Sequence, residues 1–267
     1  MAQQPLAVIT GASGGIGAAL AAEFAADGCD LLLVARNHAL LHQVAAELEQ
    51  AHGVSVMTCA VDLATADAMD VVEQRLQQLA RAPTYLVNNA GVGDYGRFWV
   101  GDELKQWRMI DLNVTALTRL TRRLLPQLIS NRGGLLNVAS DAAFRAGPGM
   151  AVYFATKAYV LSFSEALAEE LAEQQVRVTC LCPGPTLSGF QQAAGLGEPD
   201  ADARASQPDA ATVAAAGYRA FRRGRRVYIH GWKNRWRVLM LRFTSRRRAA
   251  RALWRNMRSG AAGSSSD

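Results

Sequence analysis

The residues best suited to chemistry in this 267-residue chain are a tyrosine, a lysine and a serine. Tyr153 and Lys157 stand four positions apart in an alanine-rich segment that is predicted to be helical, so both side chains share one face. Surface Tyr–Lys pairs are common and alone would mean little. Ser140, however, ends an apolar run predicted as a strand, and active sites of open α/β sheets collect at strand ends. A phenol, an ammonium group and a hydroxyl brought together there could exchange a proton with a substrate oxygen.

A glycine-rich turn near the amino terminus indicates a site for a dinucleotide. The first apolar run, Leu6–Thr10, leads directly into Gly-Ala-Ser-Gly-Gly-Ile-Gly, and a helical pattern follows. Glycines allow close approach to a pyrophosphate, and the helix N-terminus offers free N–H groups to it. A turn without a ligand is the alternative, but the place between first strand and first helix favours binding. The predicted contacts here are Gly11, Ser13, Gly14, Gly15, Ile16 and Gly17.

The end of the second apolar run, Asp30–Ala35, selects between the two nicotinamide dinucleotides. An NAD site normally has an acidic residue there, which binds the ribose hydroxyls. This chain has Arg36 instead, whose guanidinium can pair with a 2′-phosphate and stack on adenine. A solvated arginine is the alternative, but the missing carboxylate favours NADP. Further cofactor contacts are predicted for Asp62 and Leu63 near the adenine, and for Asn89, Ala90 and Gly91 near a ribose.

Apolar runs and helical patterns alternate along the chain, and this alternation predicts the fold class. The runs are continuous, as expected for strands covered on both faces. Strands are expected at 6–10, 30–35, 54–61, 84–88, 135–140, 176–182 and 225–229, and helices at 16–26, 37–52, 66–81, 102–130, 151–174 and 210–222. Residues 191–211 are expected to form a mobile loop, with Asp209 as N-cap of the helix after it. The pattern predicts one α/β domain over 1–230, a doubly wound parallel sheet of the Rossmann-like type.

Taken together, the motifs resemble those of the short-chain dehydrogenase/reductase family, in its NADP-preferring Tyr-x-x-x-Lys form. They occur in family order over residues 5–190: the glycine turn at 10–17, Asn88-Asn-Ala-Gly91, Asn113, Ser140, Tyr153-Phe-Ala-Thr-Lys157 and Pro183-Gly184. The region after them is similar to that of a bacterial subgroup of short-chain reductases. The resemblance implies that Asn113 supports a water between Lys157 and solvent, and that Lys157 also bonds the nicotinamide ribose. It places the nicotinamide end of the cofactor at Pro183, Gly184, Thr186 and Ser188.

Two positions depart from the family pattern. Gly14 stands where many NADP-preferring relatives have a basic residue, so phosphate recognition would depend mainly on Arg36. Ser188 stands where relatives often have threonine, and it keeps the hydroxyl.

The resemblance implies hydride transfer between NADP(H) and a small-molecule carbonyl or alcohol, with a lipophilic substrate as one option. A free tyrosine has a pKa of about 10, too high for a base near neutrality. Lys157 and the positive nicotinamide are expected to lower it, so that Tyr153 exchanges the proton while Ser140 holds the substrate oxygen. The rival is a non-catalytic NADP-sensing protein or a membrane-associated scaffold on the same fold. Sensing needs no proton relay, which favours the enzyme.

Charge divides the chain into an acidic body and a cationic tail. Residues 222–258 hold 14 of the 29 Lys and Arg and no Asp or Glu, whereas residues 1–221 carry a net charge of −7. Such asymmetry usually indicates a partner or a surface.

Within the tail, residues 231–258 are predicted to form two amphipathic helices that extend the domain. Their apolar stripes are Trp232, Trp236, Leu239 and Phe243, then Ala250, Leu253 and Met257. They could cover the substrate pocket or a second subunit, or lie on an anionic membrane as a peripheral contact. No nucleic-acid module is present, so no nucleic-acid partner is predicted. Residues 259–267 are small and polar, and are predicted to be a disordered tail.

The remaining signals concern cellular context. The four cysteines, Cys29, Cys59, Cys180 and Cys182, are expected to be buried thiols in a reducing compartment, and no zinc-type spacing predicts a metal site. No signal-peptide pattern and no run of about 18 apolar residues is seen, which predicts a cytoplasmic protein that is at most peripheral to a membrane. Members of the family often pair through the helices expected at 102–130 and 151–174, which implies a homo-oligomer.

Overall fold

Seven parallel strands form the centre of the molecule in the computed structural model, which describes residues 4–197 and 201–262. The strands are β1 (Leu6–Thr10), β2 (Asp30–Ala35), β3 (Val56–Ala60), β4 (Tyr85–Asn88), β5 (Gly134–Val138), β6 (Arg177–Cys182) and β7 (Val227–Ile229). Their order in the sheet is β3-β2-β1-β4-β5-β6-β7, so the direction of winding reverses between β1 and β4. This confirms the predicted doubly wound sheet and puts a ligand crevice at that reversal.

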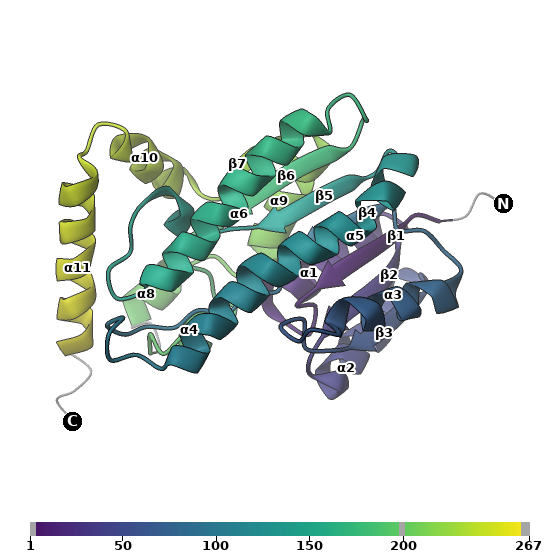
Figure 1. Ribbon diagram of the computed structural model, residues 1–267, viewed down its shortest axis with the longest axis horizontal. Helices are drawn as coiled ribbons and strands as arrows, with labels where there is room; N and C mark the ends of the chain where they lie inside the picture. Colours follow the sequence, from purple (N-terminus) through teal and green to yellow (C-terminus); the bar gives the residue numbers. More distant parts are fainter. Residues whose placement is uncertain (1–3, 198–200, 263–267) are drawn as a thin grey trace.

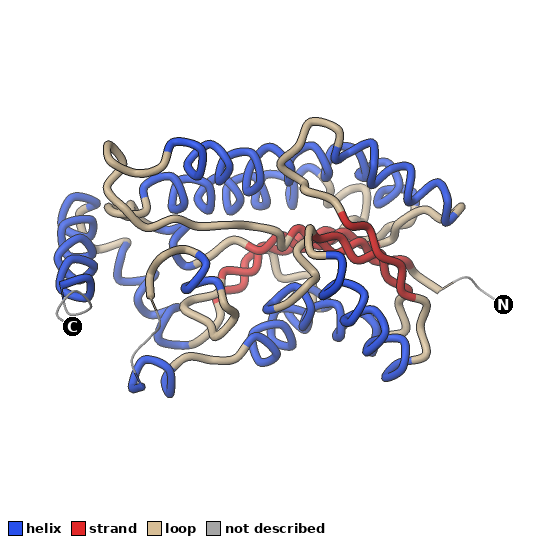
Figure 2. Tube along the Cα trace, turned by 90° about the horizontal axis from the view of Figure 1, so that it is seen from below, coloured by secondary structure: helices blue, strands red, loops and turns tan. Residues whose placement is uncertain are grey.

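Helices cover both faces of the sheet, as Figures 1 and 2 show. One face packs against α1 (Gly15–Ala26), α2 (His38–His52) and α9 (Ala210–Arg222). The other packs against α3 (Ala68–Leu79), α5 (Leu117–Ser130) and α6 (Ala151–Glu170). Because β1, β2 and β5 are buried along their whole length, their sequences are continuous apolar runs with only Asp30, Thr10 and Asn137 as polar members.

The connections confirm one expectation and correct another. The helical region predicted at 102–130 is confirmed: α4 (Glu103–Ile110) continues into a π-helical segment η1 (Asp111–Ala116) and then into α5, and Pro126 lies inside α5. The region at 191–211 is not an unstructured loop, because it holds the short helices α7 (Phe190–Ala193) and α8 (Ala201–Ser206). The predicted cap is present: the Asp209 carboxylate accepts a hydrogen bond from the Thr212 N–H at 2.7 Å.

The cationic tail forms two helices, α10 (Trp232–Leu241) and α11 (Arg246–Ala262), at the end of the molecule where the strands terminate (Figure 1). The prediction of disorder from residue 259 is wrong for 259–262, because α11 continues through them. Residues 263–267 lie outside the described part of the chain. Among the residues that the structure describes, no helix combines the length and apolarity needed to cross a bilayer.

An aromatic cluster locks α1 to the rest of the fold. The Phe24 ring is fully buried and lies 4.8 Å from the Tyr218 ring, 5.5 Å from Tyr85 and 5.8 Å from Phe221, measured between centroids. These partners belong to α9 and β4, so one side chain of α1 contacts two other elements. Such rings stabilise a core by buried area and by edge-to-face contact.

We expect Phe24→Ala to lower the free energy of unfolding by about 3–5 kcal/mol, because it leaves a cavity between α1, α9 and β4. Urea unfolding followed by circular dichroism measures this value. Leu40→Ala is the matched control, since Leu40 is 46% exposed on α2 and should change stability by less than about 0.5 kcal/mol. Equal losses in the two variants would contradict the role given to the cluster.

Candidate active site

The glycine turn after β1 is shaped by a contact that leaves no room for a side chain. Gly11 and Gly15 have φ angles of +66° and +54°, which favour glycine. A Cβ atom on Gly17 would lie 2.2 Å from the carbonyl oxygen of Gly11, so α1 packs directly on the turn. The Asn89 amide braces the same turn, because Nδ2 donates to the carbonyl oxygens of Thr10 at 3.0 Å and Gly11 at 3.2 Å.

Thr10 joins the ends of β1 and β4 at the point where the strand order reverses. Its hydroxyl oxygen accepts hydrogen bonds from the N–H groups of Asn89 and Ala90, both at 3.0 Å, and donates to the Val87 carbonyl at 3.2 Å. No role was predicted for the Thr10 side chain, although a hydroxyl at a strand end was the available signal. The Asn89 side chain is thus engaged in supporting the turn.

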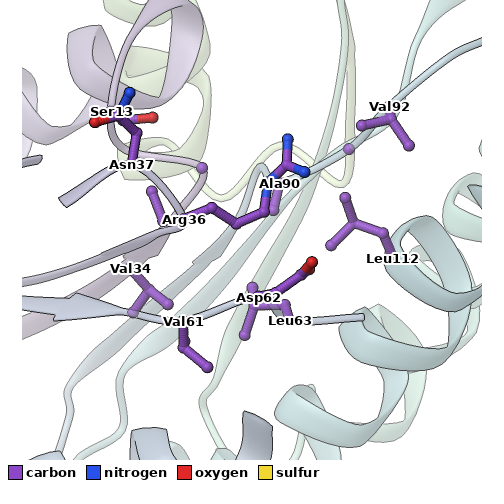
Figure 3. Close-up of a pocket in the computed structure, with 13 residues that line it drawn as sticks. Ser13, Val34, Arg36, Asn37, Val61, Asp62, Leu63, Ala90, Val92 and Leu112 are labelled. Carbon is purple, nitrogen blue, oxygen red and sulfur yellow. The ribbon is translucent and has the colours of Figure 1, made fainter. Parts of the chain in front are cut away.

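A cavity of about 440 Å³ opens at this reversal, a size typical of small-ligand pockets (Figure 3). Arg36 extends into it from the end of β2, and Asp62 points into it from the end of β3. Among the predicted cofactor contacts, the following line the cavity: Gly11, Ser13, Arg36, Asp62, Leu63, Ala90 and Gly91. The glycine turn has no room for a Cβ atom at Gly17 and lets a phosphate approach the backbone closely, and Arg36 supplies a positive charge. Both features fit a dinucleotide phosphate.

Asp62 already has partners within the protein. One carboxylate oxygen accepts from the Arg108 guanidinium of α4, and the other from the Ala64 N–H at 3.1 Å. Partial burial raises the pKa of Asp62, but these hydrogen bonds and the charges of Arg108 and Arg36 bring it below its ordinary value. The carboxylate is therefore held ionised at the edge of the pocket.

The predicted contacts after β6 are not among the residues that line the cavity, and one of them, Ser188, lies against the glycine turn. The Ser188 carbonyl oxygen would be 3.1 Å from a Cβ on Gly15, so this loop rests on the turn. The Thr186 hydroxyl donates to the Gly184 carbonyl at 2.9 Å. Gly184 itself is covered by the Asn234 side chain of α10, and Pro183 accepts a backbone hydrogen bond from Asp141 at 2.7 Å.

Ser140, Tyr153 and Lys157 come together at the end of β5. Tyr153 and Lys157 occupy successive turns of α6, and the Lys157 ammonium nitrogen lies 5.8 Å from the centre of the Tyr153 ring. Lys157 Nζ donates to the Val138 carbonyl at 2.9 Å. Ser140 begins the short helix η2 (Asp141–Phe144), where its hydroxyl accepts from the Ala142 N–H at 3.1 Å.

Asn113 is fixed within the π-helical segment η1, a rare helix type that is frequent at functional sites. Its Nδ2 donates to the Val92 carbonyl at 2.9 Å and to the Thr156 hydroxyl at 3.0 Å, and its Oδ1 accepts from the Val92 N–H. A Cβ on Gly91 would lie 3.2 Å from Asn113 Oδ1 and 3.3 Å from Lys157 Nζ. Both side chains therefore border Gly91, and the structure brings Asn113 to the lysine.

Burial controls the protonation of the reacting groups. It raises the pKa of Tyr153, and the nearby Asp141 charge raises it further, whereas the Ser140 hydroxyl lowers it. The expected lowering of the Tyr153 pKa by Lys157 is therefore not found in the protein alone. Burial instead lowers the pKa of Lys157 to about 8. Tyr153 is a neutral phenol at neutral pH, which suits a proton donor.

The far side of Tyr153 is apolar and includes residues that the sequence did not reveal. The Phe190 ring of α7 lies 5.2 Å from the Tyr153 ring. Leu253 and Met257 of α11 pack on the same cluster, and the Tyr95 hydroxyl donates to the Met257 carbonyl at 3.2 Å. The helical spacing of Leu253 and Met257 was the one sequence signal that these two residues face the body. No sequence signal placed Phe190 near Tyr153. The tail thus contributes to the surroundings of the reacting phenol.

A family model described as short chain dehydrogenase matches residues 5–198. The chain belongs to the short-chain dehydrogenase family. This confirms the predicted family and the predicted class of reaction, hydride exchange at a carbonyl or alcohol group. The matched region ends before α9, so the cationic tail lies beyond it.

Similar proteins agree with this membership. Nodulation protein G of Rhizobium meliloti (strain 1021) is 35% identical over 179 residues, which cover 67% of this chain and 71% of the relative. The very-long-chain 3-oxoacyl-CoA reductase of Laccaria bicolor is 37% identical over 64% of this chain and 52% of its own length. A short-chain dehydrogenase of Sphingobium yanoikuyae, solved with NADPH, is 35% identical with a TM-score of 0.78, covering 88% of this chain and 92% of that one. The bulky-bulky ketone specific alcohol dehydrogenase of Comamonas testosteroni is 32% identical, with a TM-score of 0.74 over 89% and 91% of the two chains.

We expect Lys157→Met to change how stability depends on pH. The folded chain releases the Lys157 proton near pH 8 and the unfolded chain near 10.5, so the unfolded state holds the extra proton between these values and native stability rises with pH. The variant lacks this rise. As the pH increases from 8 to 10.5, the melting temperature of the variant, measured by calorimetry, should therefore drop relative to that of the native chain. Lys105→Met, at a lysine whose side chain is 63% exposed, should show no such change. A pH-independent difference for Lys157→Met would contradict the burial of this charge.

Proposed function

We propose that this chain reduces a ketone or aldehyde with NADPH, with Tyr153 as the proton donor. The observation that carries the proposal is the convergence of Ser140, Tyr153 and Lys157 at the carboxyl edge of the sheet, beside the glycine turn. Bound nicotinamide supplies the hydride, and the protein supplies position and the proton. The substrate oxygen would accept hydrogen bonds from the Tyr153 and Ser140 hydroxyls, which orient the carbonyl for attack.

The proton pathway follows from the environment of each group. Tyr153 keeps its proton at neutral pH because burial disfavours the phenolate, so it can give that proton to the oxygen as negative charge develops there. The Lys157 ammonium then stabilises the phenolate that is left. Asn113 borders Lys157 and holds the backbone of Val92, and we assign it the support of a water that returns protons to Lys157.

For the cofactor we propose NADP, with Arg36 as the residue that distinguishes it from NAD. Arg36 lies on the 440 Å³ cavity where an NAD site would have a carboxylate. The similar Sphingobium yanoikuyae protein was solved with NADPH, which supports the proposal.

For the substrate we propose a lipophilic carbonyl compound. Tyr153 belongs to an apolar cluster with Met109, Met150 and Phe154, and Phe190 packs against this cluster. Such a lining suits an apolar substrate. Relatives named for bulky ketones and for very-long-chain 3-oxoacyl-CoA support this class.

We propose further that the protein is cytoplasmic and peripheral to a membrane through residues 231–258, and that it forms a homo-oligomer through α5 and α6. The described cysteines are free and buried, which is typical of a reducing compartment. On α6 the Tyr159 ring is 37% exposed and stacks on Phe163, which offers apolar surface to a second subunit.

We expect Tyr153→Phe to reduce NADPH-dependent carbonyl turnover by about 10²–10⁴-fold, because the proton donor is lost. The affinity for NADPH, measured by fluorescence titration, should stay nearly the same. Tyr159→Phe removes a hydroxyl from the same helix and should leave turnover unchanged. Full turnover in Tyr153→Phe would exclude Tyr153 as the acid, and no turnover by the native chain across a broad carbonyl panel would favour the sensing role.

We expect Arg36→Ala to weaken NADPH binding by about 10- to 100-fold, because a charge-assisted pair with the 2′-phosphate is lost. NADH, which lacks this phosphate, serves as the internal control and should bind the variant as it binds the native chain. Fluorescence titration of both cofactors measures the effect. An equal loss for the two cofactors, or a native preference for NADH, would remove the role given to Arg36.

A further inference from the structure

Large apolar side chains are exposed at one end of the molecule in two separate parts of the chain. Of the thirteen large exposed hydrophobic residues in the described part of the chain, nine lie in the segment 98–107 or on and just after α10. We call this set the aromatic end face: Phe98, Trp99, Val100, Leu104, Trp107, Trp232, Trp236, Leu239 and Phe243. A concentration of this size on a single protein marks an interaction surface, because scattered exposed residues need no explanation whereas a patch does.

Helix α11 connects the two parts of the aromatic end face. In Figure 1, α10 lies above and to the right of α11, and the label of α4 stands to the right of the lower part of α11. The Arg97 guanidinium lies 5.4 Å from the centre of the Trp99 ring and 6.0 Å from that of Trp254 on α11. The hydrogen bond from Tyr95 to Met257 holds the same loop against α11. The segment 98–107 is therefore fixed to the tail.

The inner side of α10 is attached to the active site while its aromatic side is exposed. Asn234 packs against Gly184 and donates to the His230 carbonyl at 2.9 Å. Arg237 lies 3.6 Å from Asp141, which directly follows Ser140. Trp232 and Trp236, in contrast, are 73% and 59% exposed. Of the alternatives left open for the tail, packing of the first apolar stripe on the body of the same chain does not occur in α10. The aromatic end face has a fixed position next to the reacting groups.

Charge identifies the partner. Residues 231–258 contain ten Lys and Arg and no Asp or Glu. The exposed cations Arg242, Arg246, Arg247 and Arg248 directly flank Phe243. In the segment 98–107 the acidic groups act within the protein: Asp102 caps α4 and Glu103 accepts from the Trp107 indole at 3.1 Å. Tryptophan with arginine suits the interface of an anionic bilayer, where rings lie among headgroups and cations meet lipid phosphates.

We propose that the aromatic end face docks on an anionic membrane and that the substrate is a carbonyl lipid taken from that membrane. The apolar cluster around Tyr153 is packed against by Leu253 and Met257 of α11, so apolar contacts lead from the helix between the two parts of the face to the reacting phenol. The substrate part of this inference rests on the proposed carbonyl reduction, whereas the docking part does not.

The test measures docking and turnover separately, on the full chain. Co-sedimentation is measured with vesicles of phosphatidylcholine alone or with phosphatidylserine. Two double variants are used, and each alters one part of the face. The first combines Trp99→Ser with Trp107→Ser, and the second combines Trp232→Ser with Trp236→Ser. Leu40→Ser is the matched control, at an exposed leucine on α2. NADPH oxidation with a water-soluble ketone, without vesicles, checks that every variant is folded and active.

We expect binding to phosphatidylserine vesicles only, with a loss of about tenfold in each double variant and none in Leu40→Ser. Raising salt from about 0.1 to 1 M should release the protein, because the Debye length falls from about 10 to 3 Å. The native chain should also reduce a long-chain ketone in vesicles faster than either double variant.

Three results would overturn the docking inference. These are no vesicle binding, equal binding to neutral vesicles, or unchanged binding in Trp99→Ser with Trp107→Ser. A native dimer that becomes monomeric in the double variants, without vesicle binding, would make the face a subunit interface instead. Vesicle binding without any NADPH oxidation would leave docking intact and contradict the proposed reaction.

Discussion

The carbonyl oxygen of Gly11 faces the α-carbon of Gly17 at a distance that admits no side chain, and the whole site is built around this contact. It presses the first turn of α1 onto the end of β1, so the N–H groups of that turn face the crevice beside β4. The Asn89 amide fixes the turn from the neighbouring strand. Because the cavity, Arg36 and Asp62 are grouped around this turn, a shift of α1 would move the cofactor relative to Tyr153.

Protonation at the reacting centre depends on how little water reaches it. Tyr153 and Lys157 are 8% and 6% exposed, and burial pushes the phenol toward its neutral form and the ammonium toward losing its proton. A buried tyrosine that stays protonated can act as a proton donor. The positive charge of an oxidised nicotinamide would favour the phenolate of Tyr153 and so oppose the effect of burial on this group. Tyr153 could then accept a proton when the reaction runs toward oxidation.

Local sequence patterns predicted the fold and the reacting groups because each depends on short spacings. The glycine turn, the four-residue step from Tyr153 to Lys157 and the missing carboxylate at Arg36 are all visible in neighbouring residues. The π-helical form of η1 was not visible, since its hydrogen bonds span five residues instead of four and a single such segment leaves the apolar pattern nearly unchanged.

Contacts between residues far apart in the chain could not be predicted from the sequence, for a different reason. Phe190 over Tyr153, Arg108 on Asp62 and Asn234 on Gly184 all depend on where distant segments are placed. Periodicity predicted that α10 and α11 each have an apolar stripe, but it could not tell which stripe is covered. In the structure Leu253 and Met257 pack on the body, whereas the stripe of α10 is exposed.

The Thr10 hydroxyl has one further consequence. It accepts from the N–H groups of the two residues that follow β4 and donates to Val87 within β4, so it ties together the two strands between which the winding reverses. That crevice is therefore preorganised: its walls are set by the protein's own hydrogen bonds before any nucleotide arrives. Binding then loses little free energy to the ordering of the backbone, and more of the interaction energy appears as affinity.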